Sequence, residues 1–240
     1  MDKTPRSLDA LVEHQVRKWT AERKHVPTVV GPARRWPVVT LSREYGAHGA
    51  AVGRLLAERL GFDFWDKKLV QTIADDAGAS QRVIETLDEQ RKNAFADVLG
   101  SLLKSHGLSA SEYFERLARV VQTISDHGAA VVLGRGANYL VPADRALRVR
   151  VIAPFEVRVA GVMARGGLDE KGARAEVRLI DTERAAFVRQ AYGRDVADPA
   201  DYDVVLNAGS LDAPAAVEVM VAAYRAKFGA LPEAGTRAAL

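Results

Sequence analysis

The stretch VVTLSREYGAHGAAVGRLLAERLG, residues 38–61, decides the fold prediction. It reads as a buried strand, a turn that contains Gly46 and Gly49, and an apolar-patterned helix. The two glycines allow the backbone to turn tightly and to approach a ligand, and the first N–H groups of the helix attract anions. The stretch is therefore typical of a phosphate-binding loop, although glycines in such a turn also serve packing alone.

The loop departs from the pattern G-x-x-x-x-G-K-[ST] of an active phosphate-transferring loop. Aligned on that pattern, Arg43 stands at the first glycine, His48 at the second, Gly49 at the lysine and Ala50 at the hydroxyl that binds magnesium. A later strand, which should end in an acid that orients the metal, ends in Leu133. Three electrostatic elements of the active loop are therefore missing together.

A replacement for the lysine is expected among nearby cations. Arg43 within the loop and Arg54, one turn into the helix, are the nearest candidates. His48 is a third candidate, because a protonated imidazole donates to phosphate, but it also reads as a plain loop residue.

Composition excludes several classes of protein. The 240 residues are 48% hydrophobic and include no cysteine, which excludes disulfides, thiolate zinc sites and a cysteine nucleophile. No apolar run reaches membrane-spanning length, and the first residues do not resemble a signal peptide, so a cytoplasmic protein without a membrane partner is the default. Residues 1–36 carry a net charge of +4 and the remainder about −1, which argues against a nucleic-acid partner.

The chain divides into three parts. Residues 1–36 contain an amphipathic helix, over residues 7–23, and a proline-rich linker; this helix either docks on its own domain or pairs with a second subunit. Residues 37–228 form the main domain, with a helical insertion at about 80–127 that either covers a substrate or forms a homodimer interface. Residues 229–240 are predicted to be a disordered tail.

Strand and helix patterns alternate through the main domain. Strands are predicted at 38–42, 62–65, 129–134, 146–153 and 202–208. Helices are predicted at 50–60, 67–77, 80–105, 109–127, 154–165, 169–190 and 213–227, with a capping box at Ser109 and Glu112. This order predicts an α/β fold with a parallel sheet, in which ligands bind at the carboxyl ends of the strands.

Charged residues follow two of these strands. Arg135, between two glycines, is placed to grip a phosphate or carboxylate, or else forms a structural salt bridge. Asp66 follows the strand at 62–65 and is either a ligand-binding residue or a helix N-cap. An arginine-rich segment at 158–194 is either the solvated side of a helix or a mobile lid.

These residues carry a resemblance. The segments VVTLSREYGAHGAAVGRLLAERLGFDFWDKKLV, VVLGRGANYL and YDVVLNAG resemble the cytidylate kinase-like family of bacterial proteins, over roughly residues 37–227. The resemblance implies a P-loop NTPase-like three-layer fold with about five parallel strands and an arginine-bearing lid at about 165–195. It also implies that magnesium-ATP and CMP are the ligands; no metal-binding residue is assigned.

The resemblance implies a role for each matching residue. The donor's phosphates would lie at the loop, on Gly46, Ala47, His48, Gly49 and Ala50. The acceptor nucleotide would face Asp66 and Arg135, and the lid would contain Arg178, Arg184 and Arg194. Arg43, Arg135 and Arg184 are the catalytic candidates, because phosphoryl transfer is served by positioned cations.

Two functions remain open. One is a nucleoside monophosphate kinase-like phosphotransferase, in which Arg43 or a lid arginine replaces the lysine. The other is a nucleotide-binding or sensing protein that keeps the fold with weak or lost catalysis, and whose N-terminal helix contacts a partner.

Overall fold

The computed structural model describes residues 8–24, 36–86 and 112–231. The chain forms two compact units, one made of Met1–Arg35 with Lys68–Gly128 and the other of Trp36–Lys67 with Ala129–Leu240. The whole β-sheet belongs to the second unit. The predicted linker at 25–35, the capping residue Ser109 and most of the predicted tail lie outside the described residues.

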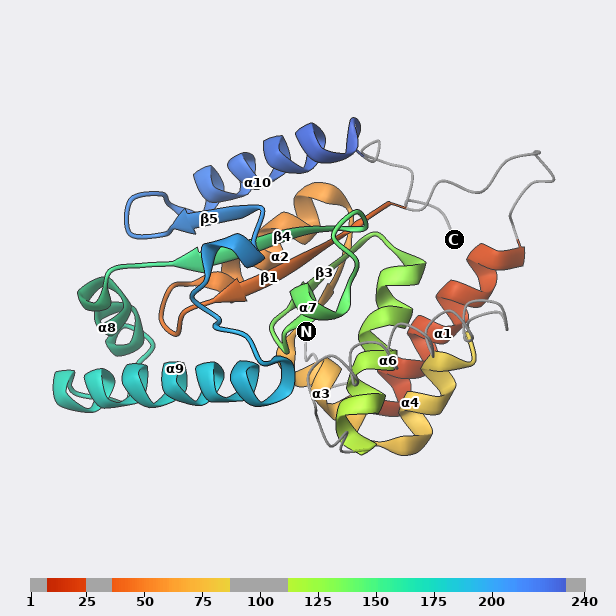
Figure 1. Cartoon of the computed structure of the whole chain (residues 1–240), viewed down its shortest axis with the longest axis horizontal. Coiled ribbons are helices and arrows are strands. Elements are labelled where there is room, and N and C mark those ends of the chain that lie inside the picture. Colours follow the sequence, from red (N-terminus) through yellow and green to blue (C-terminus); the bar gives the residue numbers. More distant parts are fainter. Residues whose placement is uncertain (1–7, 25–35, 87–111, 232–240) are drawn as a thin grey trace, which may run out of the picture. The chain divides into compact units, whose positions relative to one another are not determined.

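The sheet has five parallel strands: β1 (Val38–Arg43), β2 (Asp63–Trp65), β3 (Ala130–Leu133), β4 (Ala146–Ile152) and β5 (Val204–Asn207). Their order is β2-β3-β1-β4-β5, as Figure 1 shows. Since β1 lies in the middle, the loop that follows it reaches the edge where all the carboxyl ends meet. The predicted α/β, P-loop NTPase-like fold is thereby confirmed.

The helices of this unit follow the strands closely. They are α2 (Gly49–Leu60), α7 (Ala137–Leu140), α8 (Phe155–Met163), α9 (Glu170–Tyr192) and α10 (Ala213–Phe228), with a short 3-10 turn at Pro199–Asp201. The sequence did not predict α7 or the 3-10 turn, because single turns carry no periodic pattern.

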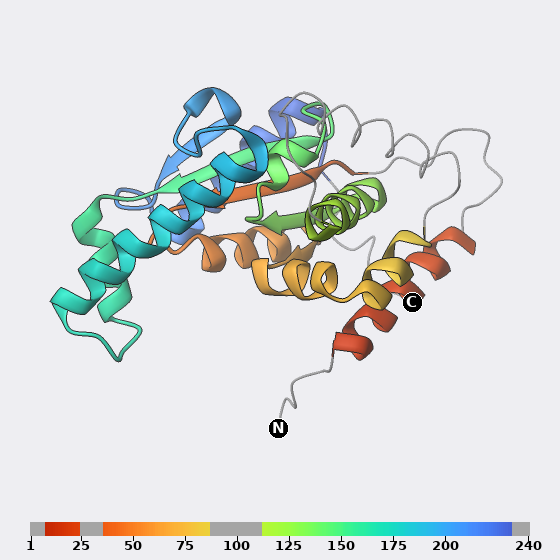
Figure 2. The ribbon, with the colours of Figure 1, turned by 60° about the horizontal axis from the view of Figure 1, so that its bottom comes forward.

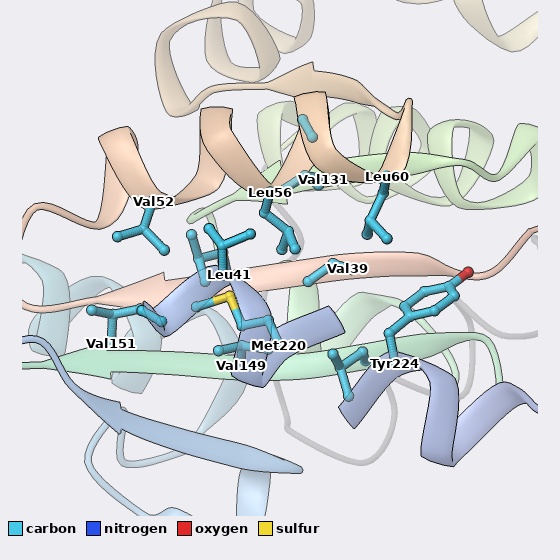
Figure 3. Packing of buried hydrophobic residues seen from close by; sticks show 14 of the residues in the cluster. Val39, Leu41, Val52, Leu56, Leu60, Val131, Val149, Val151, Met220 and Tyr224 are labelled. Atoms are coloured by element: carbon cyan, nitrogen blue, oxygen red, sulfur yellow. The ribbon is translucent and has the colours of Figure 1, made fainter. Parts of the chain in front are cut away.

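The core lies between the sheet and the helices α2 and α10. Figure 3 shows Leu56 of α2 and Met220 and Tyr224 of α10 packed around Leu41 of β1 and Val149 of β4. All five side chains are almost fully buried. Because side chains alternate across a strand, residues next to these positions point to the opposite face of the sheet.

That opposite face carries polar residues. On β4, Leu147, Val149 and Val151 belong to the core, so Arg148 and Arg150 lie on the other face. Ser42, on the neighbouring strand β1, pairs in register with Arg150 and lies on the same face of the sheet. Charged residues are rare inside a central strand, so the surroundings of Arg148 and Arg150 require an explanation.

The first unit is helical and contains α1 (Leu8–Lys24), α4 (Ala77–Ile84), α6 (Glu112–His127) and all but the first residue of α3 (Lys67–Asp75). Helices α1 and α4 lie side by side (Figure 2). Val12 and Trp19 of α1 are 1% and 4% exposed, and the Trp19 ring stacks on His127 with centroids 4.0 Å apart. Helix α1 therefore docks within its own unit. Within the described residues, no helix is long and apolar enough to cross a membrane.

Candidate active site

The glycine loop connects β1 to α2 through residues 44–48. Gly46 adopts a φ of 86°, and a Cβ at this position would lie 2.5 Å from the carbonyl oxygen of Arg158. Only glycine fits both the left-handed conformation and this close approach to α8. The tight turn that the sequence indicated is therefore present.

The loop offers backbone N–H groups to a ligand. Among the described residues, the N–H groups of Gly46, His48, Gly49 and Ala50 donate to no other group, whereas that of Tyr45 donates to the Asp181 carboxylate at 2.8 Å. Gly49 and Ala50 begin a helix of 12 residues, whose positive dipole end adds to the attraction for an anion. This arrangement suits the phosphate groups of a nucleotide.

The turn after β3 holds Arg135 in a strained conformation. Gly134, Arg135 and Gly136 have φ values of 81°, 55° and 64°, and a non-glycine residue in this region costs conformational energy. The Tyr192 hydroxyl donates to the Arg135 carbonyl oxygen at 2.5 Å and helps to hold the turn. A Cβ on Gly134 would collide with the guanidinium of Arg43. The glycine therefore makes room for Arg43 beside the turn.

These two segments border a cavity of about 380 Å³. Its basic lining consists of Arg43, Lys67, Arg135, Arg150 and Arg184, which come from the ends of three strands, the interior of β4 and helix α9. Acidic residues also line it, namely Glu44, Asp181, Glu183 and Asp195, and Ile180, Phe187 and Val188 form an apolar side. A cavity of this size, lined by several cations and by apolar side chains, suits a small organic anion.

The crowded cations perturb one another. Burial, together with the neighbouring charges of Arg184 and Arg135, lowers the pKa of Arg43 to about 9. Burial and the charges of Arg135, Arg184 and Arg43 also lower the pKa of Lys67 below its ordinary value. Arg43 remains charged at pH 7, and an anion in the cavity would relieve the repulsion among these cations.

Helix α9 is tied to the loop by several polar contacts. Arg184 donates to the Arg43 carbonyl oxygen at 3.0 Å, and the Tyr45 hydroxyl donates to Glu176 at 2.6 Å. Buried Arg158 of α8 forms ion pairs with Asp181 of α9 and with Glu44 of the loop, the latter at 3.4 Å. These contacts fix the position of Arg184 over the end of β1.

The structure brings together some of the predicted site residues. Arg43, Arg135 and Arg184 line one cavity, while the Asp66 carboxylate lies 3.8 Å from Arg54 and its charge opposes the lowering of the Arg43 pKa. Residues 46–50 do not line this cavity and form the separate cradle of N–H groups.

Three predicted residues lie elsewhere. The His48 imidazole lies against Gly161 of α8, so it points away from the cavity. Arg178 stacks over Phe155, with its guanidinium carbon 5.2 Å from the ring centroid, and Arg194 is exposed. Neither of these arginines lines the cavity.

Sequence reasoning missed Lys67 and Arg150 as site residues and did not single out Arg158. Arg150 left a signal, because a charged residue inside the apolar run ALRVRVIA of a central strand is rare. Lys67 directly follows Asp66, and the predicted role in ligand binding was given to Asp66 alone. Arg158 looked like one of several arginines on a helix, and its burial depends on tertiary packing.

Metal binding was tested against the residues present. Within the described part of the chain, no group of three His, Cys, Asp or Glu side chains is arranged to hold a metal ion. Ala50 also lacks the hydroxyl that an active loop supplies. Magnesium that takes its ligands from phosphate groups and water needs few protein ligands, so the cradle fits a metal-nucleotide complex better than a free ion.

Comparison with known proteins agrees with this geometry. The profile of the cytidylate kinase-like family matches residues 38–210, which include the loop, the cavity and all five strands. This chain belongs to the cytidylate kinase-like family. The match spans more than two-thirds of the chain and stops short of helix α1.

Two curated relatives are cytidylate kinases. That of Methanothermobacter thermautotrophicus is 28% identical over 74% of this chain and 99% of its own length. That of Archaeoglobus fulgidus is 25% identical over 79% of this chain and 95% of its own length. A solved structure of an uncharacterized protein from Eubacterium ventriosum covers 80% of this chain and 99% of its own, with a TM-score of 0.63 and 20% identity, which shows the shared fold.

Proposed function

We propose that this member of the cytidylate kinase-like family transfers a phosphoryl group from ATP to a small acceptor such as CMP. The observation that carries the proposal is the placement of Arg43, Arg135 and Arg184 around one cavity beside a cradle of unpaired N–H groups. Two adjacent anion sites are what an in-line transfer between a donor and an acceptor requires. The kinase family supports the reaction class.

Each part of the site has a role in this proposal. The N–H groups of Gly46, His48, Gly49 and Ala50 hold the donor's phosphates, and magnesium bound to those phosphates would neutralise part of their charge. Arg135 holds the acceptor's phosphate, and the apolar side of the cavity contacts its uncharged part. The segment 165–195, which contains α9, acts as the lid.

Arg43 and Arg184 replace the missing lysine. Both side chains line the cavity, and Arg184 also bonds to the loop through the Arg43 carbonyl oxygen. Lys67 supplies a further cation from the end of β2. Because the buried guanidinium of Arg43 already lies at the end of β1, it needs no reorganisation to meet a phosphate.

A second candidate function is nucleotide sensing without efficient transfer. The observation that favours it is the combination of Gly49 and Ala50 at the lysine and hydroxyl positions with Leu133 at the end of β3. Loss of one preorganised charge of this kind typically slows catalysis by roughly a hundred- to a thousandfold. Binding would survive such losses, because the cradle and the cationic cavity would still attract phosphates.

The test is ADP formation from magnesium-ATP with a panel of nucleoside monophosphates. We expect one acceptor to raise turnover well above background, and Arg135→Ala or Arg43→Ala to reduce that increase by roughly a hundredfold or more. Arg225→Ala is the matched control, because this arginine of α10 is exposed and lies outside both the cavity lining and the lid segment. Equal turnover with and without every acceptor would contradict the proposal, and nucleotide binding without turnover would favour the sensor.

A further inference from the structure

Arg150 is a buried arginine without an acidic partner. It is 7% exposed, and among the described residues its guanidinium forms no ion pair. Its one hydrogen bond to a side chain goes from Nη1 to the Ser42 hydroxyl oxygen at 3.0 Å. A buried charge is normally paired, because removing it from water costs several kcal/mol.

Its neighbour Arg148 shows the usual solution. Both arginines lie on the same face of β4, two positions apart. Arg148 donates from Nη2 and from its backbone N–H to the carboxylate of Asp203, at 3.0 and 2.8 Å. Arg150 has only Ser42 and the Tyr202 ring, whose centroid lies 5.7 Å from its guanidinium carbon. The protein therefore pairs one arginine of this strand and leaves the other open.

The open arginine lines the cationic cavity, as does Ser42. Ser42 accepts a hydrogen bond from Arg150, and its hydroxyl oxygen also lies 3.4 Å from the Tyr202 hydroxyl, which donates to the Val196 carbonyl oxygen at 2.9 Å. The Ser42 hydroxyl hydrogen is therefore engaged only in this long contact and can turn to a ligand in the cavity. The charge of Arg150 also contributes to lowering the pKa of Arg184, which lines the same cavity, although burial is the larger cause. The two side chains therefore offer a guanidinium fork and an O–H donor to one ligand group.

We propose that Arg150 and Ser42 form an anion subsite on the floor of the cavity, which binds an oxyanion of the acceptor. The chemistry is that of a phosphomonoester or a carboxylate, both of which match a guanidinium fork. The anion supplies the charge partner that the chain withholds from Arg150. The assignment of this subsite to the acceptor rests on the proposed phosphotransfer, whereas the existence of the subsite does not.

The test measures thermal unfolding of the full chain with inorganic phosphate as the probe and chloride at matched ionic strength as the control. Phosphate should raise the Tm of the wild type, and Arg150→Met should weaken the apparent affinity for phosphate by roughly ten- to a hundredfold. Without phosphate, Arg150→Met should unfold at or above the wild-type Tm, because it removes an unpaired buried charge. Arg148→Met, the matched control, should lower the Tm and keep the phosphate response, while Arg150→Lys should retain part of that response.

Two outcomes would overturn the subsite. A fall in Tm for Arg150→Met as large as that for Arg148→Met would make Arg150 a structural residue. A full phosphate response in Arg150→Met would place the anion elsewhere. The comparison of CMP with cytidine tests the assignment to the acceptor. CMP should stabilise the wild type more than cytidine does, and Arg150→Met should reduce that difference, with Arg135 still in place, while ATP binding stays unchanged. If the phosphate response depends on Arg150 but no acceptor stimulates turnover, the anion subsite is supported and the proposed kinase activity is refuted.

Discussion

Arg158 is expected to hold the loop, α8 and α9 together. Its side chain is almost fully buried, donates to the Ala153 carbonyl oxygen at 3.0 Å and forms ion pairs with Glu44 and Asp181. Replacement by methionine leaves both carboxylates without this partner. Breaking a buried pair in this way typically costs about 3–5 kcal/mol. Because the two carboxylate side chains are 25% and 29% exposed, we expect the lower end, about 3 kcal/mol.

The assay is urea unfolding of Arg158→Met, with the free energy of unfolding taken from the transition of the sheet-containing unit. Arg174→Met is the matched control, because the pairs of Arg174 with Glu156 and Glu170 are exposed and should contribute little to stability. Adding Asp181→Asn to Arg158→Met should recover part of the loss, since it removes one orphaned carboxylate. A loss for Arg158→Met no larger than that for Arg174→Met would refute the reasoning.

Two further predictions concern the helical unit and the cavity. Trp19→Ala should destabilise the helical unit by about 3–5 kcal/mol, because the Trp19 ring is buried against His127. Leu11→Ala, on the exposed side of α1, should cost much less stability. Equal losses of unfolding free energy in urea would contradict the docking of α1. Phosphate affinity should fall as pH rises through about 9, where Arg43 loses its proton. The ligand-free protein should gain stability over the same range, because the arginine of the unfolded chain has a higher pKa and keeps its proton there. Isothermal titration across pH 7–10 measures the phosphate affinity, and urea unfolding over the same range measures the stability. If neither quantity changes with pH, the lowered pKa of Arg43 is wrong.

Much of the fold was predictable from the sequence, because its elements have strong local patterns. The run VVTLS and the helix after it fixed β1 and α2, and the other four predicted strands match β2 to β5 to within a few residues. Right-handed connections between parallel strands then brought Arg43 and Arg135 to one edge without further information. The predicted helix at 80–105 corresponds to α4 only up to Ile84, and residues 87–111 lie outside the described part of the chain.

The site was less predictable, because its key properties depend on tertiary packing. The separation of the N–H cradle from the cationic cavity depends on which way the loop turns, which the pattern of glycines does not specify. The direction of His48 is set by α8, more than a hundred residues along the chain. Whether an arginine is paired or open, as with Arg148 and Arg150, depends on where Asp203 lies after folding.

Transfer of the labelled γ-phosphoryl group of ATP to CMP tests the central claim most directly. The wild type should form labelled CDP in the presence of magnesium, and Arg135→Ala should form it far more slowly while Arg225→Ala matches the wild type. The contradicting result is a protein that binds both nucleotides but forms neither labelled CDP nor any other labelled product from the nucleoside monophosphate panel. That result would refute the claim that this cavity transfers phosphoryl groups.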